Sequence, residues 1–426
     1  MKKIKRQPIV SEQQKIGEFI TGLRENKGLT QKEFARRLKT TQSAIARMER
    51  GQQNFSTEML AKISKIFGKN VISLGSDHLN FKIEGGHRLS GTVITNTSKN
   101  TAVALLCASL LNRRQTVLRG VPKVDDVYTV IKILKSIGVK INWLNEADLA
   151  ISPPAALKLK QIDKLSALKT RSTLLLIGSI LSRLDNFLIP HPGGCKLGAR
   201  TIKPHLFALE KLGINIGSKS DHYEVETKRK QPAEIVLYES SDTATENVIM
   251  AASAIGGATT IKYASANYMV QELCHFLSLL GVEFDGLGTT QLIIHGNPNL
   301  SGDIEYCLGE DPIESMLFLA IGSVTNSALT IKRCPIDFLE LELLKLDKMG
   351  LKFKLSPKYK SRNERTNLVD IQIFPSKLRA LEEKIYARPF PGLNIDNLPF
   401  FVPIALKAKG TTLIHDWVYE NRAIYY

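Results

Sequence analysis

The chain has 426 residues, 43% of them hydrophobic and 23% charged, which is the composition of a globular protein of two or three domains. No apolar run reaches the roughly 18 residues of a membrane span. No apolar segment follows the basic Met1–Arg6, so neither a membrane protein nor a secretory signal is expected. Five scattered cysteines lack metal-ligand spacing and argue against a disulfide framework, so we expect a cytoplasmic protein without a metal site.

The positive charge is concentrated at the start of the chain. The formal net charge is +17, and residues 1–75 carry 16 Lys and Arg against 6 Asp and Glu, a net charge of +10. Such an asymmetry is typical of a nucleic-acid-binding segment. A small basic domain with no nucleic-acid partner is the alternative.

Four helices are expected in this first segment, at residues 11–26, 30–38, 41–49 and 56–67. Apolar residues recur at helical spacing in each of them. Thr30 and Glu33 form a capping-box pattern at the start of the second helix. Gly28 and Gly51 follow helices at the position where a left-handed residue ends them.

The segment from about Ile16 to Leu74 resembles the phage-repressor type of helix-turn-helix, through Leu-Thr-Gln-x-Glu-x-Ala at 29–35 and Glu-x-Gly at 49–51. The resemblance implies a DNA-binding domain over residues 1–75 and a homodimer on double-stranded DNA. It places the start of the third helix in the major groove, where side chains would reach base edges: Thr41, Gln42, Ser43 and Arg47. Gln31, Lys32 and Arg36 would hold phosphates. The alternative is a helical bundle that serves only dimerisation.

A repeat follows the short linker at residues 75–78. An amphipathic helix ends in an apolar residue, a glycine and another apolar residue, and then a strand is expected. This happens at Gly138, Gly213, Gly281 and Gly350, which lie 68 to 75 residues apart. A short β-rich stretch opens each unit about 20 residues earlier, and a fifth opening occurs at Thr412-Leu413. We expect the fifth unit to be incomplete.

The second repeat is about five residues longer than the others, and the excess lies in the loop from His191 to Arg200. Gly193 and Gly194 permit a sharp bend before Cys195. Lys196 and Arg200 would favour the thiolate and attract an anion. The loop therefore fits the presentation of a reactive cysteine to an anionic substrate. A tight glycine turn beside an incidental buried thiol is the alternative.

The letters Pro-Gly-Gly-Cys-Lys-Leu-Gly-Ala-Arg at 192–200 resemble the active-site loop of the UDP-N-acetylglucosamine enolpyruvyl transferases. That resemblance covers Asn80 to Arg422 and implies an inside-out α/β barrel fold, with two domains made of βα repeats and helices buried inside the sheets. It places the linker and first strands of transferase domain 1 at 76–98, domain 2 at 99–309, and the rest of domain 1, incomplete at its C-terminus, at 310–426.

Further segments carry the resemblance and imply site residues. Lys99 and Asn100 precede an apolar helix and would bind phosphoenolpyruvate together with Arg200, at a helix N-terminus suited to phosphate. Asp396, in a segment similar to the family's Phe-Pro-Thr-Asp, would accept the proton of the sugar 3-hydroxyl. The predicted UDP-sugar contacts are Arg171, Arg200, Ile202, His205, Asp396, Val418 and Arg422.

The implied reaction is addition followed by elimination, in the first committed step of peptidoglycan synthesis. Cys195 would protonate the methylene carbon of phosphoenolpyruvate, and Asp396 would remove the hydroxyl proton as the oxygen attacks the neighbouring carbon. Phosphate then leaves. The resemblance implies no metal and no organic cofactor.

The sequence departs from the family's pattern in three places. Lys203 stands where an aspartate meets the uracil, and it cannot accept a hydrogen bond. The family's Ala-Arg-Glu-Pro-Glu reads Ser-Ala-Asn-Tyr-Met at 265–269, and its Pro-Ser-Val-Gly-Ala-Thr-Glu-Asn is half kept, with Asp242 after Ser241. A second reading therefore stays open, in which a DNA-binding regulator uses a transferase-like part as a sensor without turnover.

Overall fold

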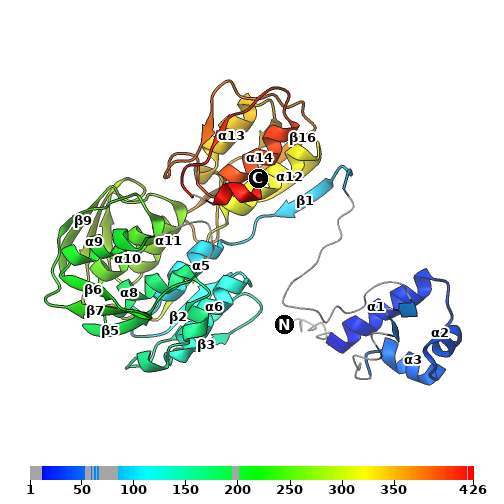
Figure 1. Cartoon of the computed structure of the whole chain (residues 1–426), viewed down its shortest axis with the longest axis horizontal. Coiled ribbons are helices and arrows are strands. Elements are labelled where there is room, and N and C mark those ends of the chain that lie inside the picture. The colour runs from blue at the N-terminus through cyan, green and yellow to red at the C-terminus, as the bar shows by residue number, and fades with distance from the viewer. Residues whose placement is uncertain are drawn as a thin grey trace, which may run out of the picture. The chain divides into compact units, whose positions relative to one another are not determined.

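The computed structural model describes residues 12–52, 59, 62, 63, 65, 66, 85–193, 201–419 and 421–426. The chain divides into two units, Met1–Gly85 and Gly86–Tyr426 (Figure 1). The expected linker at 75–78, Cys195 and Arg200 lie outside the described residues. Within the expected fourth helix, the five described positions between 59 and 66 are helical.

Three helices of the first unit lie where the sequence predicted them: α1 (Glu12–Asn26), α2 (Gln31–Leu38) and α3 (Gln42–Glu49). Thr30 caps α2 in a complete capping box with Glu33, and Thr41 caps α3 by accepting a hydrogen bond from the Ala44 amide. Gly28 and Gly51 have φ of 64° and 66°, so both predicted helix stops adopt the left-handed conformation.

The core of the first unit is built by α1, α2 and α3 together with Ile63. Gly17 on α1 lies so close to α3 that a Cβ there would stand 2.6 Å from the carbonyl oxygens of Met48 and Glu49. Beside this contact, the Arg24 Nε donates to Glu49 Oε1 over 2.5 Å, and both side chains are largely buried. The fully buried apolar side chains are Ile20, Phe34, Ile45, Met48 and Ile63.

The second unit has a large lobe and a small lobe, which we define by their sheets. Three sheets form the large lobe. Their orders are β12-β2-β4-β3, β5-β7-β6 and β10-β11-β9-β8. The strands are β2 (Thr116–Arg119), β3 (Lys140–Trp143), β4 (Leu149–Ser152), β5 (Asn186–Pro190), β6 (Ile214–Ser218), β7 (His222–Thr227), β8 (Glu234–Val236), β9 (Gly257–Lys262), β10 (Glu283–Asp285), β11 (Gln291–Gly296) and β12 (Ile304–Cys307).

Helices fill the interior of the large lobe. Along α5, α8 and α10 nearly every side chain is buried, which is the burial expected of helices surrounded by sheets. Gly178 of α8 permits close packing, because a Cβ there would stand 2.3 Å from the Asn247 carbonyl oxygen on α10. The helices of this lobe are α5 (Lys99–Ala108), α6 (Asp125–Ser136), α7 (Lys164–Ala167), α8 (Leu175–Ile180), α9 (Lys203–Lys211), α10 (Asp242–Ser253) and α11 (Tyr268–Ser278), with short 3-10 helices η1 (Leu159–Gln161) and η2 (Arg171–Leu174).

One sheet of the small lobe has the path β1-β13-β16-β14, and β15 also pairs with β16. Gly322 of α12 lies against this sheet, since a Cβ there would stand 2.0 Å from the Ile373 side chain. The strands are β1 (Ser90–Ile94), β13 (Ala328–Pro335), β14 (Lys352–Leu355), β15 (Tyr359–Lys360), β16 (Asn367–Phe374), β17 (Ile385–Tyr386) and β18 (Ile414–His415). The helices are α12 (Pro312–Val324), η3 (Ile336–Phe338), α13 (Glu340–Lys348), α14 (Leu398–Lys407) and η4 (Arg422–Tyr425).

The four repeat glycines occupy the same position in four repeats, each of which runs strand, helix, strand, strand. Gly138, Gly213, Gly281 and Gly350 have φ of 96°, 84°, 83° and 90° and follow α6, α9, α11 and α13. Each lies in the left-handed region that side chains other than glycine disfavour. In every repeat the last strand (β4, β7, β11 or β16) pairs antiparallel with both the first and the second. The repeat read from the sequence is therefore confirmed in its geometry.

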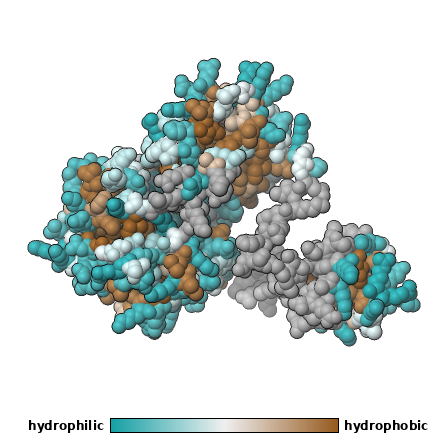
Figure 2. Space-filling model, viewed as in Figure 1, coloured by the Kyte–Doolittle hydropathy of each residue, from teal (hydrophilic) through white to brown (hydrophobic). Residues whose placement is uncertain are grey.

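Figure 2 shows hydrophobic side chains on the visible face of both lobes of the second unit. In the small lobe, Leu406, Leu413 and Trp417 are 79%, 64% and 57% exposed. Among the described helices, none combines the length and apolar character that crossing a bilayer requires.

Candidate active site

The N-terminus of α5 carries the first two predicted site residues. Ser98 caps the helix by accepting a hydrogen bond from the Thr101 amide, and Lys99 is the first helical residue after this cap. The Lys99 Nζ lies 2.7 Å from Asp126 Oδ2, and both side chains are nearly half exposed. An ion pair this exposed contributes at most about 1 kcal/mol. A phosphate arriving at this helix end therefore competes for the lysine at little cost.

Asn100 faces inward from the same helix end. Its Nδ2 donates to the hydroxyl of Tyr268, the first residue of α11, over 3.1 Å. The Tyr268 ring packs edge-on against Phe338 of the small lobe, with centroids 5.8 Å apart. The predicted phosphoenolpyruvate site thus lies where the two lobes meet.

Both ends of the predicted cysteine loop are held by the segment around α7 and η2. Before the loop, the Gly193 amide donates to the Ala167 carbonyl, and a Cβ at Gly193 would stand 1.6 Å from the Leu168 carbonyl oxygen. After the loop, the Arg171 Nη2 donates to the Thr201 carbonyl over 2.8 Å. Cys195 and Arg200 belong to the intervening residues, which lie outside the described part of the chain. Arg171, a predicted UDP-sugar contact, thus binds Thr201, the first described residue after the loop.

The four cysteines outside that loop are poor candidates for a reactive thiol. Cys107, Cys274 and Cys334 are buried, and Cys307 is half-buried; all four are free. Burial raises the pKa of each of these thiols above its ordinary value. None of the four is therefore a thiolate near neutral pH.

His205 is buried under α10. Asn247 Nδ2 lies 3.1 Å from His205 Nδ1, and Thr243 Oγ1 lies 3.4 Å from Nε2, so both ring nitrogens have protein partners. The Asn247 Oδ1 in turn accepts the Gly178 amide. The histidine therefore ties α9 to α10 and α8. Ile202, just before α9, is half-buried against the same core.

Asp396 lies exposed in the loop before α14. Its amide donates to Asn394 Oδ1 over 2.9 Å, and the buried Glu342 accepts hydrogen bonds from the Asn394 amide and the Asn397 side chain. These hydrogen bonds therefore hold the loop that carries the predicted base, Asp396.

Arg422 also holds the Asp396 loop in place. It is 5% exposed and bidentate to Asp416, and its Nη1 donates to the Ile395 carbonyl over 2.8 Å. Val418 is half-buried in the adjoining core. In the described residues Arg422 thus supports the Asp396 loop, and Val418 packs against the core of the small lobe.

Asp396 acts electrostatically on residues of the large lobe. Burial raises the pKa of Asp242, and the nearby charge of Asp396 raises it further, while hydrogen bonds from Ser265 and Asn267 oppose the shift. The pKa of Tyr268 is also raised, mainly by burial, with smaller contributions from Asp311 and Asp396. The charge of Asp396 in the small lobe therefore acts across the lobe junction on Asp242 and Tyr268 of the large lobe.

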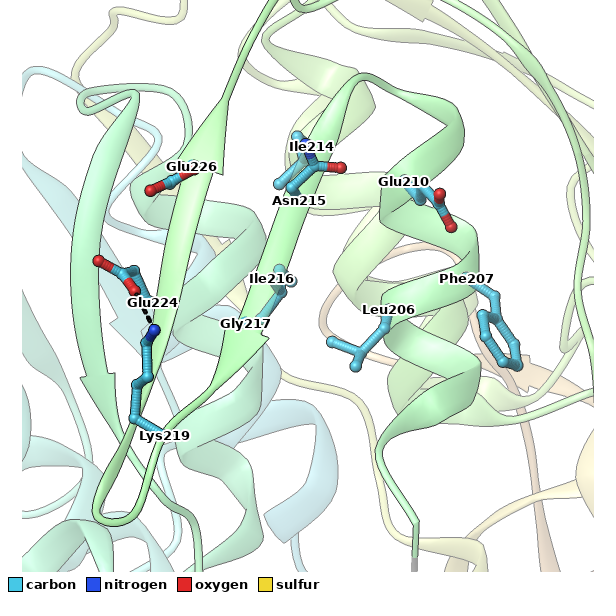
Figure 3. Close-up of a pocket in the computed structure, with 10 residues that line it drawn as sticks. All are labelled: Leu206, Phe207, Glu210, Ile214, Asn215, Ile216, Gly217, Lys219, Glu224 and Glu226. Carbon is cyan, nitrogen blue, oxygen red and sulfur yellow. Dashed lines mark ion pairs between the residues drawn. The ribbon is translucent and has the colours of Figure 1, made fainter.

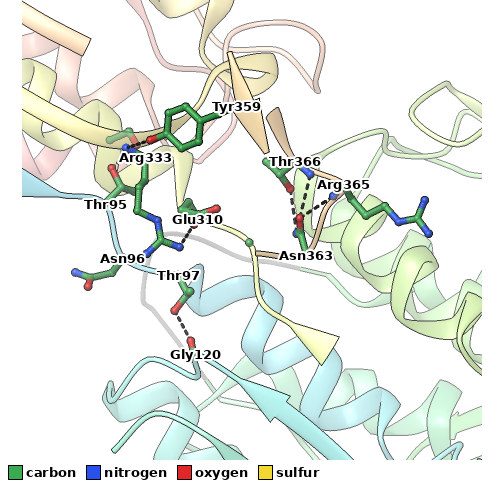
Figure 4. Close-up of polar contacts among 12 residues, drawn as sticks. Thr95, Asn96, Thr97, Gly120, Glu310, Arg333, Tyr359, Asn363, Arg365 and Thr366 are labelled. Carbon is green, nitrogen blue, oxygen red and sulfur yellow. Dashed lines mark hydrogen bonds and ion pairs between the residues drawn. The ribbon is translucent and has the colours of Figure 1, made fainter. Parts of the chain in front are cut away.

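The lobes are joined by two antiparallel segments, residues 95–98 and 308–311. The Ser98 amide donates to the Gly309 carbonyl over 2.9 Å, and the Asp311 amide donates to the Asn96 carbonyl over 2.8 Å. Figure 4 shows this connection, with the Thr97 hydroxyl on the Gly120 carbonyl and Arg333 paired with the buried Glu310.

A hairpin loop of the small lobe adds a third link at Glu272 of α11. Asn363 Nδ2 donates to Glu272 Oε1 over 2.6 Å, and the Gly309 amide donates to Oε2 over 3.0 Å (Figure 4 shows Asn363 with its neighbours). Glu272 is 4% exposed, and burial raises its pKa to about 7, although the Gly309 amide donor opposes the shift.

We expect Glu272→Gln to flatten the pH dependence of stability. A carboxyl whose pKa is raised on folding stays protonated while the unfolded chain ionises, so the wild type loses stability as pH rises from 4.5 to about 7. The unfolding free energy of the variant, relative to wild type, should rise by about 1.4 kcal/mol per pH unit, reaching about 3 kcal/mol. Denaturant unfolding at several pH values measures it. The exposed Glu146→Gln should show no such trend, and an equal slope in wild type and Glu272→Gln would contradict the assignment.

A pocket of about 550 Å³ opens between α9 and strands β6 and β7 (Figure 3). Its lining includes Glu210, Glu224 and Glu226, with Lys219 paired to Glu224 at 3.2 Å. Three carboxylates disfavour a phosphorylated substrate, and the lining contains none of the predicted site residues. We therefore do not assign the substrate to this pocket.

The predicted DNA-contacting residues gather on one face of the first unit. Thr41, Gln42, Ser43 and Arg47 are exposed at and along α3. Gln31 is half-buried, and its Nε2 donates to Glu49 Oε2 over 2.8 Å, which ties the start of α2 to α3. The exposed face of α3 thus offers polar and basic side chains for groove contact.

Sequence reasoning singled out neither Asp242, Tyr268 nor Glu272 as functional. The only signal for the first two was their place in segments that depart from the family's pattern. Glu272 has the appearance of an ordinary helical glutamate in the sequence. Among the described residues, no group of three or more His, Cys, Asp or Glu side chains is placed to hold a metal ion.

Comparisons with known proteins cover nearly the whole chain. Residues 83–425 match the family described as EPSP synthase (3-phosphoshikimate 1-carboxyvinyltransferase), and residues 22–73 match the helix-turn-helix family. The UDP-N-acetylglucosamine 1-carboxyvinyltransferases of Bradyrhizobium diazoefficiens and Campylobacter jejuni are 29% and 32% identical to this chain. The matches cover 82% and 80% of this chain and 79% and 78% of those proteins.

Solved structures show the same fold. The enolpyruvyl transferase NikO from Streptomyces tendae aligns with a TM-score of 0.65 at 19% identity, over 78% of this chain and 76% of its own. The EPSP synthase of Acinetobacter baumannii aligns with a TM-score of 0.59 at 17% identity, over 77% of this chain and 73% of its own.

Proposed function

Because the chain belongs to the enolpyruvyl transferase family, we propose that it transfers the enolpyruvyl group of phosphoenolpyruvate to the 3-hydroxyl of UDP-N-acetylglucosamine. One observation carries the proposal beyond the relatives' names. The Tyr268 ring packs on Phe338 of the small lobe, and its hydroxyl contacts Asn100 beside Lys99, so the lobe that carries the predicted base meets the large lobe next to the predicted phosphate site. The reaction is the first committed step of peptidoglycan synthesis, and we place it in the cytoplasm.

The proposed chemistry proceeds in two steps. Lys99, the α5 N-terminus and Arg200 hold the phosphate and carboxylate of phosphoenolpyruvate. The sugar oxygen bonds to C2 while Asp396 takes its proton and Cys195 protonates C3, which gives a tetrahedral adduct. Loss of a proton from C3 then restores the double bond as the C–O bond to phosphate breaks. Lys203 lies exposed at the start of α9 and would meet the nucleotide in place of an acceptor.

The test is phosphate release from phosphoenolpyruvate, with and without UDP-N-acetylglucosamine, by the full chain. Release that requires both substrates supports the transferase. An absence of release, together with a rise in Tm on adding UDP-N-acetylglucosamine, would overturn turnover and favour a sensor that binds the sugar nucleotide.

We also propose that the first unit binds double-stranded DNA as a homodimer through α3. The support is the exposed row of Gln42, Ser43 and Arg47 and the net positive charge of the segment. In such a domain the start of this helix meets base edges, where Gln and Arg pair with adenine and guanine.

We expect Gln42→Ala to reduce specific binding by about 1–3 kcal/mol and to relax selectivity at one base pair. A DNA site is first selected from a random pool with the full chain, and binding is then followed by fluorescence anisotropy at several salt concentrations. Lys32→Ala is the comparison. Loss of a phosphate contact should weaken binding to all DNA sequences equally and should lower the salt dependence of the binding constant. If wild type selects no sequence, the domain serves dimerisation instead.

A further inference from the structure

Tyr268 occupies a position at the lobe junction that the proposed mechanism leaves without a role. It is 3% exposed, and its hydroxyl oxygen accepts a hydrogen bond from Asn100 Nδ2 over 3.1 Å. It also shares a hydrogen bond with Ser98, the residue that caps α5. One hydroxyl therefore contacts the residues on either side of Lys99.

The backbone of Tyr268 is itself fixed. Asn267 caps α11 by accepting the Tyr268 amide over 2.9 Å. The Asn267 Nδ2 also donates to Asp242 Oδ2 over 3.3 Å, and Ser265 donates to the other oxygen of that carboxyl. These hydrogen bonds join the start of α11 to the start of α10, and they fix the backbone position of Tyr268.

The ring of Tyr268 is held from the small lobe. Phe338 packs against it, and Phe390 packs against Phe338 with centroids 5.2 Å apart. Contacts between aromatic rings at such distances are favourable beyond the area that they bury. The ring is thus a packing element between the lobes, whereas the hydroxyl contacts Asn100 and Ser98 at the start of α5.

The chemistry of the hydroxyl fits orientation and not proton transfer. Burial raises the pKa of Tyr268 well above 10, and the nearby Asp311 raises it further, so the phenol keeps its proton throughout the working pH range. A neutral hydroxyl that accepts from Asn100 fixes which way that amide points.

We propose that Tyr268 is a positioning residue for phosphoenolpyruvate, whose hydroxyl orients Asn100 and the Ser98 cap so that the N-terminus of α5 is preset for the bound phosphate. The inference rests on the proposed function, because it assigns the anion at this helix end as phosphoenolpyruvate. Preset donors avoid the ordering cost that a mobile amide would add on binding.

The test is Tyr268→Phe, which keeps the ring and removes only the hydroxyl. The KM and the directly titrated Kd for phosphoenolpyruvate should rise about fivefold to tenfold, the effect of one lost hydrogen bond. The KM for UDP-N-acetylglucosamine and kcat should stay within about twofold. Tyr306→Phe is the matched control, because it removes a buried hydroxyl that contacts Glu272 and not Asn100, and it should leave the Kd for phosphoenolpyruvate unchanged.

A second variant distinguishes a positioning role of Tyr268, acting through Asn100, from a general loss of packing at the lobe junction. Asn100→Ala should weaken phosphoenolpyruvate binding, and adding Tyr268→Phe to it should weaken binding no further. Additive losses, or an unchanged Kd in Tyr268→Phe alone, would overturn the inference. A wild type that binds phosphoenolpyruvate but releases no phosphate would overturn the proposed turnover only, since the Kd comparison still tests Tyr268.

Discussion

Cys195→Ala is expected to lower the rate of phosphate release by at least about 100-fold, the loss typical of a missing general acid. The reason is that alanine has no proton to give to the methylene carbon of phosphoenolpyruvate. The loop's entrance should be unaffected, because Gly193 is held at the Ala167 and Leu168 carbonyls and not by the cysteine. Single-turnover phosphate release with both substrates measures the effect.

The control for this substitution is Cys307→Ala. Cys307 is free and half-buried on β12, and burial raises the pKa of its thiol, so it should not take part in the chemistry. Titration of phosphoenolpyruvate into Cys195→Ala checks that the site still binds. A variant that keeps the wild-type rate would exclude the cysteine as the acid.

Asp396→Asn is expected to lower kcat by a factor of about 10² to 10⁴, because an amide cannot take the proton of the attacking hydroxyl. Its loop should keep its shape, since the hydrogen bond there comes from the Asp396 amide and the supports are Asn394, Glu342 and Arg422. Binding of both substrates should therefore change by no more than a few fold, which isothermal titration measures beside the steady-state rates.

Asp347→Asn serves as the matched control for Asp396→Asn. Asp347 lies exposed on α13 of the same lobe, and losing its charge should leave kcat at the wild-type value. A large fall in substrate affinity in Asp396→Asn, with kcat preserved, would mean that this carboxylate binds the substrate and does not act as the base.

Local rules predicted much of this protein. The capping box at Thr30 and Glu33 formed as expected, because its partners are three residues apart. The glycines at 138, 213, 281 and 350 were predicted as helix stops, because a residue of positive φ after a helix leaves a readable signal in one sequence. The helix-turn-helix region and the enolpyruvyl transferase fold are confirmed by the family matches.

The lobe junction was not predictable in the same way. Asn100 and Tyr268 are 168 positions apart, and Glu272 meets Asn363 across 91 positions. No local period links such pairs, and a buried glutamate cannot be told from a solvated one on an amphipathic helix. Only the folding of two lobes around the antiparallel segments at 95–98 and 308–311 brings these residues together.

The hydrogen-bonded group of Asp242, Ser265 and Asn267 has a consequence for how this protein evolves. All three depart from the family's pattern, and each gives or receives a bond from another of the three. Restoring one family residue alone would leave a partly buried carboxyl short of a donor, or two donors without their acceptor. Such positions are epistatic, so their order of substitution matters. A redesign of this hydrogen-bonded group must exchange the three residues together.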